Sequence, residues 1–122
     1  MIKIGLKGHF DSAHYLRDYN GKCASLHGHT WNVEIVLCGE TDNKSGMLLD
    51  FNIVKKLLNQ ETDKFDHKVI NEIPPFDEKN PTAENLAKEF YCNLTKTMPA
   101  NIKLLSVKIW ESPNAWAEYS EN

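Results

Sequence analysis

Residues 27–38 read His-Gly-His-Thr-Trp-Asn-Val-Glu-Ile-Val-Leu-Cys, and this stretch decides the fold because it alternates as a β-strand does. Successive side chains on a strand point to opposite faces, so residues two apart share a face. An earlier segment, residues 3–14, has a mixed alternation that also predicts a strand. A loop over residues 17–22, marked by Asn20-Gly21, and a polar turn over residues 39–46 flank the clear strand. We expect the two strands to pair antiparallel.

Two helices are expected in the middle of the chain. Asp50 can cap a helix that runs to about Phe65, and Thr82 can cap a second helix that has Glu84 in its first turn. Apolar residues recur at helical spacing in both segments: Phe51, Val54, Leu57 and Leu58 in the first, and Leu86, Phe90, Leu94 and Met98 in the second. Residues 66–79 between the helices are expected to be irregular because Pro74-Pro75 interrupts regular structure.

The C-terminal part of the chain predicts two more strands. Residues 102–111 form one, with Leu105, Val107, Ile109 and Glu111 on one side, and residues 116–119 form a short last strand. The order ββααββ predicts a two-layer α+β fold, with two helices on one face of an antiparallel sheet. Large apolar groups are expected on the open face too. An exposed apolar face and free strand edges are liabilities for a monomer, so we expect the chain to oligomerise through its sheet.

The composition is that of one ordinary globular domain, residues 1–122, because 41% of the residues are hydrophobic and 25% are charged. A net charge of −3 and a pI near 5.9, without a run of Lys or Arg, argue against a nucleic-acid partner. The N-terminal residues lack the apolar core of a signal peptide, and no stretch approaches the ~20 apolar residues of a membrane span. We therefore expect a cytoplasmic protein with no membrane partner.

Three histidines and one thiol form the candidate site. His27 and His29 share a strand face, and His14 can supply a third imidazole from the earlier strand. Three neutral nitrogens with an open fourth position are typical of a catalytic zinc site, and the nearby Cys23 thiol could act as a base or nucleophile. The His-x-His pair alone fits ordinary polar packing equally well. His9 falls on the opposite face and is expected to be a surface or packing residue.

The other two cysteines are assigned to packing. Three cysteines is an odd number and forms no disulfide-scaffold pattern. Free cysteine behaves as a small hydrophobic residue, so we expect Cys38 and Cys92 to pack against neighbours. Cys23 differs from them because its surroundings are polar and rich in histidine.

Six motifs along the chain carry a resemblance to a known family. They are Phe10-Asp11-Ser12-Ala13-His14, Cys23-x-x-x-His27-Gly28-His29, Gly46-Met47-x-x-Asp50-Phe51, Asp66-His67-x-x-x-Asn71, Pro81-Thr82-Ala83-Glu84-Asn85 and Trp110-Glu111. In this order and spacing the sequence is similar to the 6-pyruvoyltetrahydropterin synthase family, and most to its 6-carboxytetrahydropterin synthase branch. The resemblance implies the tunnelling fold (T-fold), in which ββααββ units join around a barrel as trimers, and two trimers stack into a homohexamer. It also implies active sites between subunits, where Cys23 and the Asp66-His67 pair would meet.

The resemblance assigns roles to individual residues. His14, His27 and His29 match the zinc ligands, and Zn²⁺ would act as a Lewis acid on the side-chain oxygens of a pterin. Cys23 matches the catalytic general base, with His67 as its partner and Asp66 orienting the imidazole. A loop cap or a surface pair is the alternative for Asp66-His67. Glu111 matches a catalytic and pterin-binding carboxylate, and Thr82 matches a pterin contact, although an N-cap role explains Thr82 as well.

The implied substrate is 7,8-dihydroneopterin triphosphate, from which family branches make different products. One branch forms 6-pyruvoyltetrahydropterin, and another forms acetaldehyde, triphosphate and the queuosine (7-deazaguanine) precursor 6-carboxy-5,6,7,8-tetrahydropterin. A third replaces the cysteine with Glu and cleaves the side chain for folate synthesis. Cys23 is present and residues 24–26 are Ala, Ser and Leu, which disfavours the third branch. The short spacing from Cys23 to His27 resembles the carboxy branch. The pyruvoyl product and a non-catalytic zinc- and pterin-binding protein are the alternatives.

Overall fold

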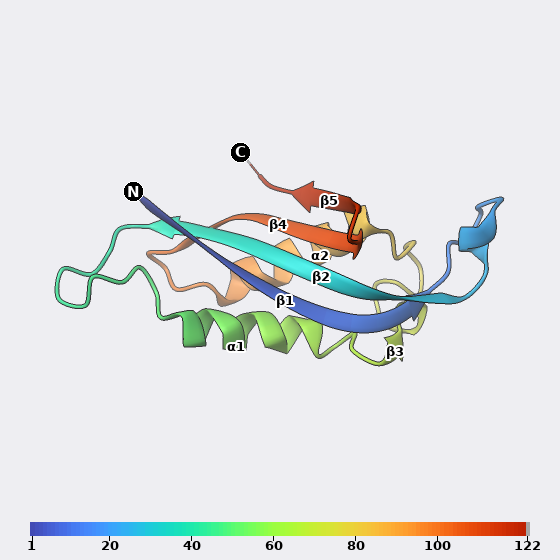
Figure 1. Cartoon of the computed structure of the whole chain (residues 1–122), viewed down its shortest axis with the longest axis horizontal. Coiled ribbons are helices and arrows are strands. Elements are labelled where there is room, and N and C mark those ends of the chain that lie inside the picture. The colour runs from blue at the N-terminus through green and yellow to red at the C-terminus, as the bar shows by residue number, and fades with distance from the viewer. Residues whose placement is uncertain (122) are drawn as a thin grey trace.

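The computed structural model describes residues 1–121, which form one five-stranded sheet with two helices (Figure 1). The strands lie in the order β3-β1-β2-β4-β5. The elements in chain order are β1 (Ile2–His14), the 3₁₀ turn η1 (Lys22–Ala24), β2 (His27–Gly39), α1 (Phe51–Thr62), β3 (Lys68–Val69), the 3₁₀ turn η2 (Ile70–Glu72), α2 (Ala83–Thr97), β4 (Lys103–Ser112) and β5 (Ala115–Tyr119). The predicted α+β order is confirmed, with β3 as an addition.

Strands β1 and β2 pair antiparallel along their whole length, from Ile2↔Gly39 to His14↔His27. The predicted alternation of β2 is confirmed, because Trp31, Val33, Ile35 and Leu37 are all fully buried. The face that they share packs under the helices. Phe10 of β1 stacks on Trp31 at 5.9 Å and on Phe90 of α2 at 5.7 Å between ring centroids. This aromatic layer closes one end of the core beneath the end of the sheet that carries the histidines.

Both helices begin where their caps predict. The Asp50 carboxylate accepts from the Asn52 amide at 2.8 Å, and the Thr82 hydroxyl accepts from the Asn85 amide at 3.1 Å. Helix α1 ends at Thr62, three residues before the predicted end at Phe65. The prediction that Phe51 belongs to the buried stripe is wrong, since its side chain is 56% exposed, whereas Val54 and Leu58 are buried. Phe51 is the first residue of α1, directly after the cap Asp50, and its side chain stays largely in solvent.

The segment between the helices is more regular than predicted. Lys68 and Val69 form β3, parallel to β1, and η2 follows directly. The prediction of an irregular segment is therefore wrong over residues 68–72. Its physical reason is a local bridge to β1: the Asp66 carboxylate accepts from the Asp11 amide at 2.9 Å, and the His67 amide donates to the Asp11 carbonyl at 2.6 Å.

A β-bulge changes the predicted register of β4. The pairing with β2 shifts between Val36 and Leu37, so that Leu37 pairs with Leu104. Leu104 is consequently buried in the core, and Leu105, which was predicted to share a face with Val107, is only partly buried. Strand β5 begins at Ala115, one residue earlier than predicted. The bulge leaves Val107, Ile109 and Glu111 on the helix-covered face, as predicted.

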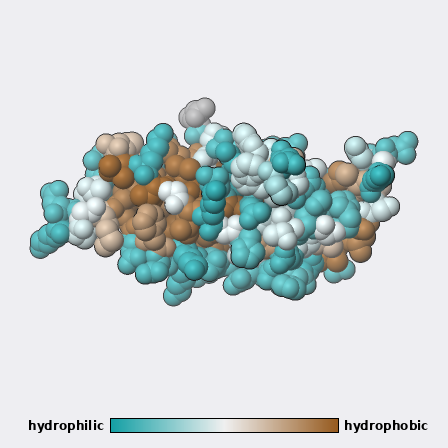
Figure 2. All heavy atoms as spheres, in the orientation of Figure 1, coloured by the Kyte–Doolittle hydropathy of each residue, from teal (hydrophilic) through white to brown (hydrophobic). Residues whose placement is uncertain are grey.

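The open face of the sheet is more polar than predicted. Its central row pairs opposite charges on four strands: Lys7 with Glu34, Glu34 with Lys108, and Lys108 with Glu118. Figure 2 shows hydrophobic residues gathered in the left half of the molecule, and hydrophilic ones over most of the right half and the lower edge. Expected apolar surface is thus present over only part of the molecule.

Cys38 and Cys92 differ in burial. The prediction that Cys92 packs against neighbours is wrong, because Cys92 is exposed on α2; Cys38 is buried as predicted. Within residues 1–121, neither helix has the length and apolarity needed to cross a membrane.

Candidate metal centre

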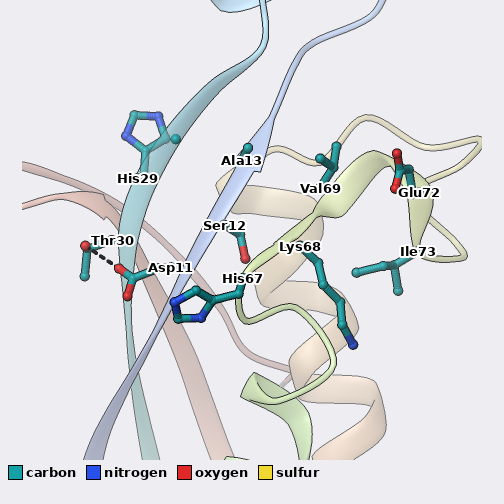
Figure 3. A pocket seen from close by; sticks show the side chains of 11 residues that line it. Asp11, Ser12, Ala13, His29, Thr30, His67, Lys68, Val69, Glu72 and Ile73 are labelled. Atoms are coloured by element: carbon teal, nitrogen blue, oxygen red, sulfur yellow. Dashed lines mark hydrogen bonds between the residues drawn. The ribbon is translucent and has the colours of Figure 1, made fainter.

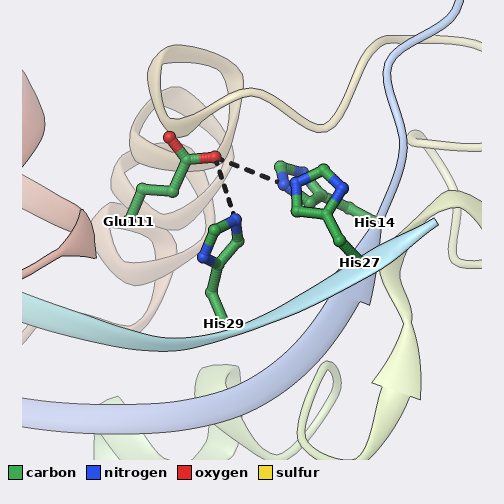
Figure 4. A group of neighbouring side chains, drawn as sticks. All are labelled: His14, His27, His29 and Glu111. Carbon is green, nitrogen blue, oxygen red and sulfur yellow. Dashed lines mark ion pairs between the residues drawn. The ribbon is translucent and has the colours of Figure 1, made fainter. Parts of the chain in front are cut away.

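The strand register brings the three predicted ligands together. His14 ends β1 and pairs with His27, which begins β2, while His29 pairs with Ser12. All three side chains lie on the same face of the sheet as Phe10 and Trp31, at the end of the sheet that the helices do not cover. Glu111 reaches the same place from β4 (Figure 4). One potential ligand atom from each of the four residues lies within 4.8 Å of the others.

Backbone carbonyls orient two of the imidazoles. His14 Nδ1 lies 2.7 Å from the Pro81 carbonyl oxygen, and His27 Nδ1 lies 2.6 Å from the Ser25 carbonyl oxygen. A carbonyl oxygen only accepts, so each Nδ1 carries the hydrogen and each neutral ring presents a bare Nε2. Metal-binding histidines are commonly fixed in this way. Trp31 adds an edge contact to both His14 and His29, at 4.8 and 5.4 Å between ring centroids.

The electrostatics of the cluster favour a cation. Burial lowers the pKa of His14 most, and the neighbouring His27 and His29 lower it further, against the opposing effects of Pro81 and Glu111. Burial is also the main cause that lowers the pKa of His29. Neutral rings therefore face the Glu111 carboxylate, whose Oε1 lies 3.3 Å from His14 Nε2 and 3.4 Å from His29 Nε2. Both Nε2 atoms are buried without a hydrogen-bond partner.

These residues fit a divalent metal ion. Nitrogen lone pairs and a carboxylate converge on one point, and a cation there would satisfy the two buried Nε2 atoms. Imidazole suits zinc and other transition metals, and three imidazoles with a carboxylate are poor partners for magnesium or calcium. The convergence of His14, His27 and His29 was predicted from the sequence. The contact of Glu111 with two of them was not, and no local sequence signal indicates it.

Asp66 and His67 form a second group at the edge of β1. The Asp66 carboxylate lies 2.9 Å from His67 Nδ1 and also accepts from the Asp11 amide, which is the larger cause of its lowered pKa. Asp66 in turn raises the pKa of His67. His67 has φ of 58°, a left-handed conformation that ordinary residues rarely adopt and that is common at functional sites. The pair was predicted, and the structure joins its two members.

This pair borders an open groove of about 960 Å³ (Figure 3). The groove is lined by residues 11–13 of β1, by residues 28–30 of β2, which include His29 of the metal cluster, and by residues 67–69, 72 and 73. Asp11 accepts a hydrogen bond from the Thr30 hydroxyl at 2.5 Å. Asp11 and His14 are three residues apart on one strand, so their side chains point to opposite faces. The Asp66-His67 pair therefore lies beside the face of β1 that is opposite the metal cluster.

Among the described residues, neither the Cys23 nor the Thr82 side chain makes a hydrogen bond to either group. Cys23 lies in η1, in the connection between β1 and β2, and is partly buried. The hydrogen bonds of Asp66 and His67 go to each other, to Asp11 and to the Thr62 carbonyl, and none goes to Cys23. Thr82 caps α2 directly after Pro81, whose carbonyl holds His14. The structure of one chain thus does not bring Cys23 to its predicted partner.

Comparisons with known proteins agree with this geometry. The sequence model of the 6-pyruvoyl tetrahydropterin synthase family matches residues 3–122. The 6-carboxy-5,6,7,8-tetrahydropterin synthase of Bacillus subtilis is 30% identical, over 91% of this chain and 80% of the relative. The dihydroneopterin monophosphate aldolase of Pyrococcus furiosus is 33% identical, over 89% of each chain. The solved structure of Caenorhabditis elegans 6-pyruvoyl tetrahydropterin synthase superposes with a TM-score of 0.89 at 27% identity, over 99% of this chain and 96% of that one.

Proposed function

This chain belongs to the 6-pyruvoyl tetrahydropterin synthase family, and from this premise we propose that it converts 7,8-dihydroneopterin triphosphate to 6-carboxy-5,6,7,8-tetrahydropterin, acetaldehyde and triphosphate. The observation that carries the proposal is the convergence of His14, His27, His29 and Glu111 around two buried, unpartnered nitrogens. The choice of reaction is supported by the name of the Bacillus subtilis relative and by the short spacing from Cys23 to His27.

The three imidazoles would hold Zn²⁺, with their Nε2 atoms bare and with two of the rings oriented by the Pro81 and Ser25 carbonyls. A zinc ion bound there would supply Lewis acidity to the side-chain oxygens of the pterin. Glu111 faces the same point and is about one-third exposed, at 35%. Its carboxylate has a second oxygen to offer a pair of N–H donors, such as the ring N–H and amino group of a pterin. Thr82 is proposed as a further pterin contact.

Cys23 is proposed as the general base that removes a carbon-bound proton from the substrate side chain. A free thiol is mostly protonated at neutral pH and needs a cationic neighbour to form a thiolate. His67 can provide that charge, because Asp66 raises its pKa and fixes its Nδ1–H, leaving Nε2–H free for the sulfur. When the thiolate takes the substrate proton it becomes a neutral thiol beside the protonated His67, and the thiolate forms again once that proton has left to product or solvent.

We further propose that Cys23 and His67 come from different copies of the chain. In one chain the Asp66-His67 pair lies on the side of β1 opposite the metal cluster, and its hydrogen bonds do not include Cys23. A homo-oligomer, specifically a hexamer built as a dimer of trimers, would place the pair of one copy beside Cys23 of another. Strand β5 is one edge of the sheet, and β3 pairs with β1 only at Ser12 and Ala13, so the rest of β1 and β5 offer free edges for such pairing.

Two other reactions compete with this proposal. Triphosphate elimination to 6-pyruvoyltetrahydropterin is one, supported by the 0.89 TM-score to the Caenorhabditis elegans synthase. Aldol cleavage of a dihydroneopterin monophosphate is the other, since a 33% identical relative bears that name. A zinc- and pterin-binding protein without turnover would have no use for the Asp66-His67 pair.

Product analysis tests the proposal. The zinc-loaded protein is incubated anaerobically with 7,8-dihydroneopterin triphosphate and, separately, with the monophosphate; pterins are identified by mass spectrometry and acetaldehyde is assayed. Acetaldehyde together with 6-carboxytetrahydropterin is the expected result, and Cys23→Ala is the negative control. A 6-pyruvoyl product without acetaldehyde, or turnover of the monophosphate alone, would replace the proposal with the corresponding competitor. Absence of turnover with both substrates would favour the binding role.

A further inference from the structure

Arg17 is the only arginine among the 122 residues; every other basic side chain apart from the histidines is lysine. Its guanidinium donates to three backbone carbonyls: Phe76 at 2.8 Å, Lys79 at 3.0 Å and Asn71 at 3.4 Å. Phe76 and Lys79 belong to the connection between η2 and α2, and Asn71 lies in η2 itself. A planar fork with fixed donors can serve several acceptors at once, which the single ammonium of lysine does less well. The chain thus uses its one arginine to organise this connection.

The backbone of Arg17 makes a second link to the same connection. Its amide donates to the Asn80 side-chain oxygen at 2.8 Å, and its carbonyl accepts from the Asn80 side-chain nitrogen at 3.0 Å. The Asn80 amide group therefore acts as a strand partner for Arg17. Asn80 is itself tied to α2, because its carbonyl accepts from the Asn85 side chain at 2.9 Å and from the Thr82 amide at 2.9 Å.

The Asn71 side chain makes the same pair of bonds to the backbone of Tyr15, which lies two residues before Arg17. That side chain accepts from the Tyr15 amide at 3.0 Å and donates to the Tyr15 carbonyl at 2.9 Å. The β1–β3 register pairs Ser12 with Lys68 and Ala13 with Val69, and the Tyr15–Asn71 pair keeps the same offset. Side-chain amides thus continue the ladder after the backbone has turned into η2. Asn71 is buried, so this link is protected from water.

The two links enclose a metal ligand. His14 lies directly before Tyr15, and Pro81 lies directly after Asn80. The Pro81 carbonyl oxygen accepts from His14 Nδ1 at 2.7 Å and so fixes which nitrogen of that buried ring is bare. A shift of the 76–81 backbone would move this carbonyl and release the ring. Nothing else among the described hydrogen bonds of His14 holds its orientation.

We propose that the Arg17 side chain, acting through the backbone of residues 76–80 and the Pro81 carbonyl, is a positioning group of the metal centre. The inference rests on the proposed function only in requiring that the histidine cluster binds a divalent metal. Hydrogen-bond partners behind metal-binding histidines typically change metal affinity by about 10- to 100-fold when removed. The same size of effect is expected from Arg17, although it touches neither the metal nor a ligand.

Cobalt titration of the purified full chain tests the inference. Co²⁺ affinity and the visible absorption of the Co²⁺ form are measured for wild type, Arg17→Lys and Asn80→Ala, with zinc competition as a second affinity measurement. Arg17→Lys keeps the charge and loses the guanidinium bonds to the backbone carbonyls of Phe76 and Lys79. Asn80→Ala removes the separate bonds between the Asn80 side chain and the Arg17 backbone. Val54→Ala, a truncation in the core under α1, is the matched control for lost stability.

The inference predicts about tenfold or weaker Co²⁺ binding and an altered absorption band in both site variants. Val54→Ala should lower thermal stability and leave affinity and spectrum as in wild type. Wild-type affinity and spectrum in Arg17→Lys and Asn80→Ala would overturn the inference, as would an equal loss in Val54→Ala. If wild type itself binds neither Co²⁺ nor Zn²⁺, the proposed function fails together with it.

Discussion

Removing metal from the cluster of His14, His27, His29 and Glu111 is expected to lower the melting temperature by about 12–16 °C. Without metal, two buried Nε2 atoms lack partners, and each unsatisfied buried group costs about 1–3 kcal/mol. Metal in 100- to 1,000-fold excess over its Kd adds about 2.7–4.1 kcal/mol of stability. The two ranges overlap near about 3–4 kcal/mol. With 122 residues, the unfolding entropy is about 0.26 kcal/mol/K, which converts that energy into the stated shift.

Calorimetry of chelator-treated and zinc-reconstituted protein measures this shift, at one protein concentration because assembly would also change the melting temperature. His27→Ala should lose the zinc-dependent increment. His9→Ala is the matched control, since His9 is an exposed histidine on β1 outside the cluster, and it should keep the increment. An increment below about 2 °C in wild type, where about 12 °C is expected, or a full increment in His27→Ala, would refute the argument from unpartnered nitrogens.

The following predictions concern Asp66, Cys23 and Thr82. Asp66→Asn should lower the pKa of His67 toward its ordinary 6.5, because Asp66 is the main cause that raises it; NMR titration of the imidazole measures this, and an unmoved midpoint would contradict it. The raised pKa of His67 stabilises the fold fully below 6.5, and the lowered pKa of Asp66 stabilises it fully above 3.8, so urea midpoints of wild type and Asp66→Asn should differ most between these values. The difference should vanish as the pH falls through the lowered pKa of Asp66, and should shrink only in part as the pH rises through the raised pKa of His67, because the bond from the Asp11 amide persists there. Cys23→Ala should abolish turnover with zinc still bound, and loss of zinc, measured by metal analysis, would make Cys23 a ligand instead. Thr82→Ala should cost about 1 kcal/mol through the lost cap, whereas Thr82→Ser should not, and a rise in KM in Thr82→Ala beyond that in an equally destabilised variant would support a pterin contact.

The metal ligands could be predicted because they obey the period of a strand. His27 and His29 follow the same alternation that buries Trp31, and antiparallel pairing brings the end of β1 to the start of β2. The position of Glu111 depends instead on the register of β4 against β2, which contains a bulge that the apolar pattern of residues 102–111 does not reveal. The same bulge exchanged Leu104 and Leu105 between faces. The alternation of side chains predicts which face of the sheet a residue lies on, but its neighbours on the next strand depend on the register of the pairing.

The links made by Arg17, Asn71 and Asn80 lie beyond such reasoning for a different reason. Each joins residues more than 50 positions apart through a side-chain amide or a guanidinium, which has no period along the chain. Residues 66–79 show no strand period because the ladder that continues β3 is made partly by side-chain amides and not by backbone. The local signals that do exist, the prolines and the polar composition, indicate a loop, which is wrong over residues 68–72, and they do not indicate what holds the segment.

Strand β1 divides the candidate chemistry between its two faces. His14 points into the metal cluster, while Asp11, three residues earlier, points to the groove that His67 borders. Within one chain, the sheet stands between the Asp66-His67 pair and the metal cluster, so this pair cannot act on a substrate bound at the metal. Either His67 serves no catalytic role, or it serves the cluster of another copy. The left-handed backbone of His67 and the two-point hold on Asp66 favour the second reading, because a solvated surface pair would not need either. Complementation follows from this: mixing Cys23→Ala with His67→Ala subunits should restore part of the activity that each lacks alone, provided subunits exchange, and no restoration in demonstrably mixed oligomers would place both residues in one chain's site.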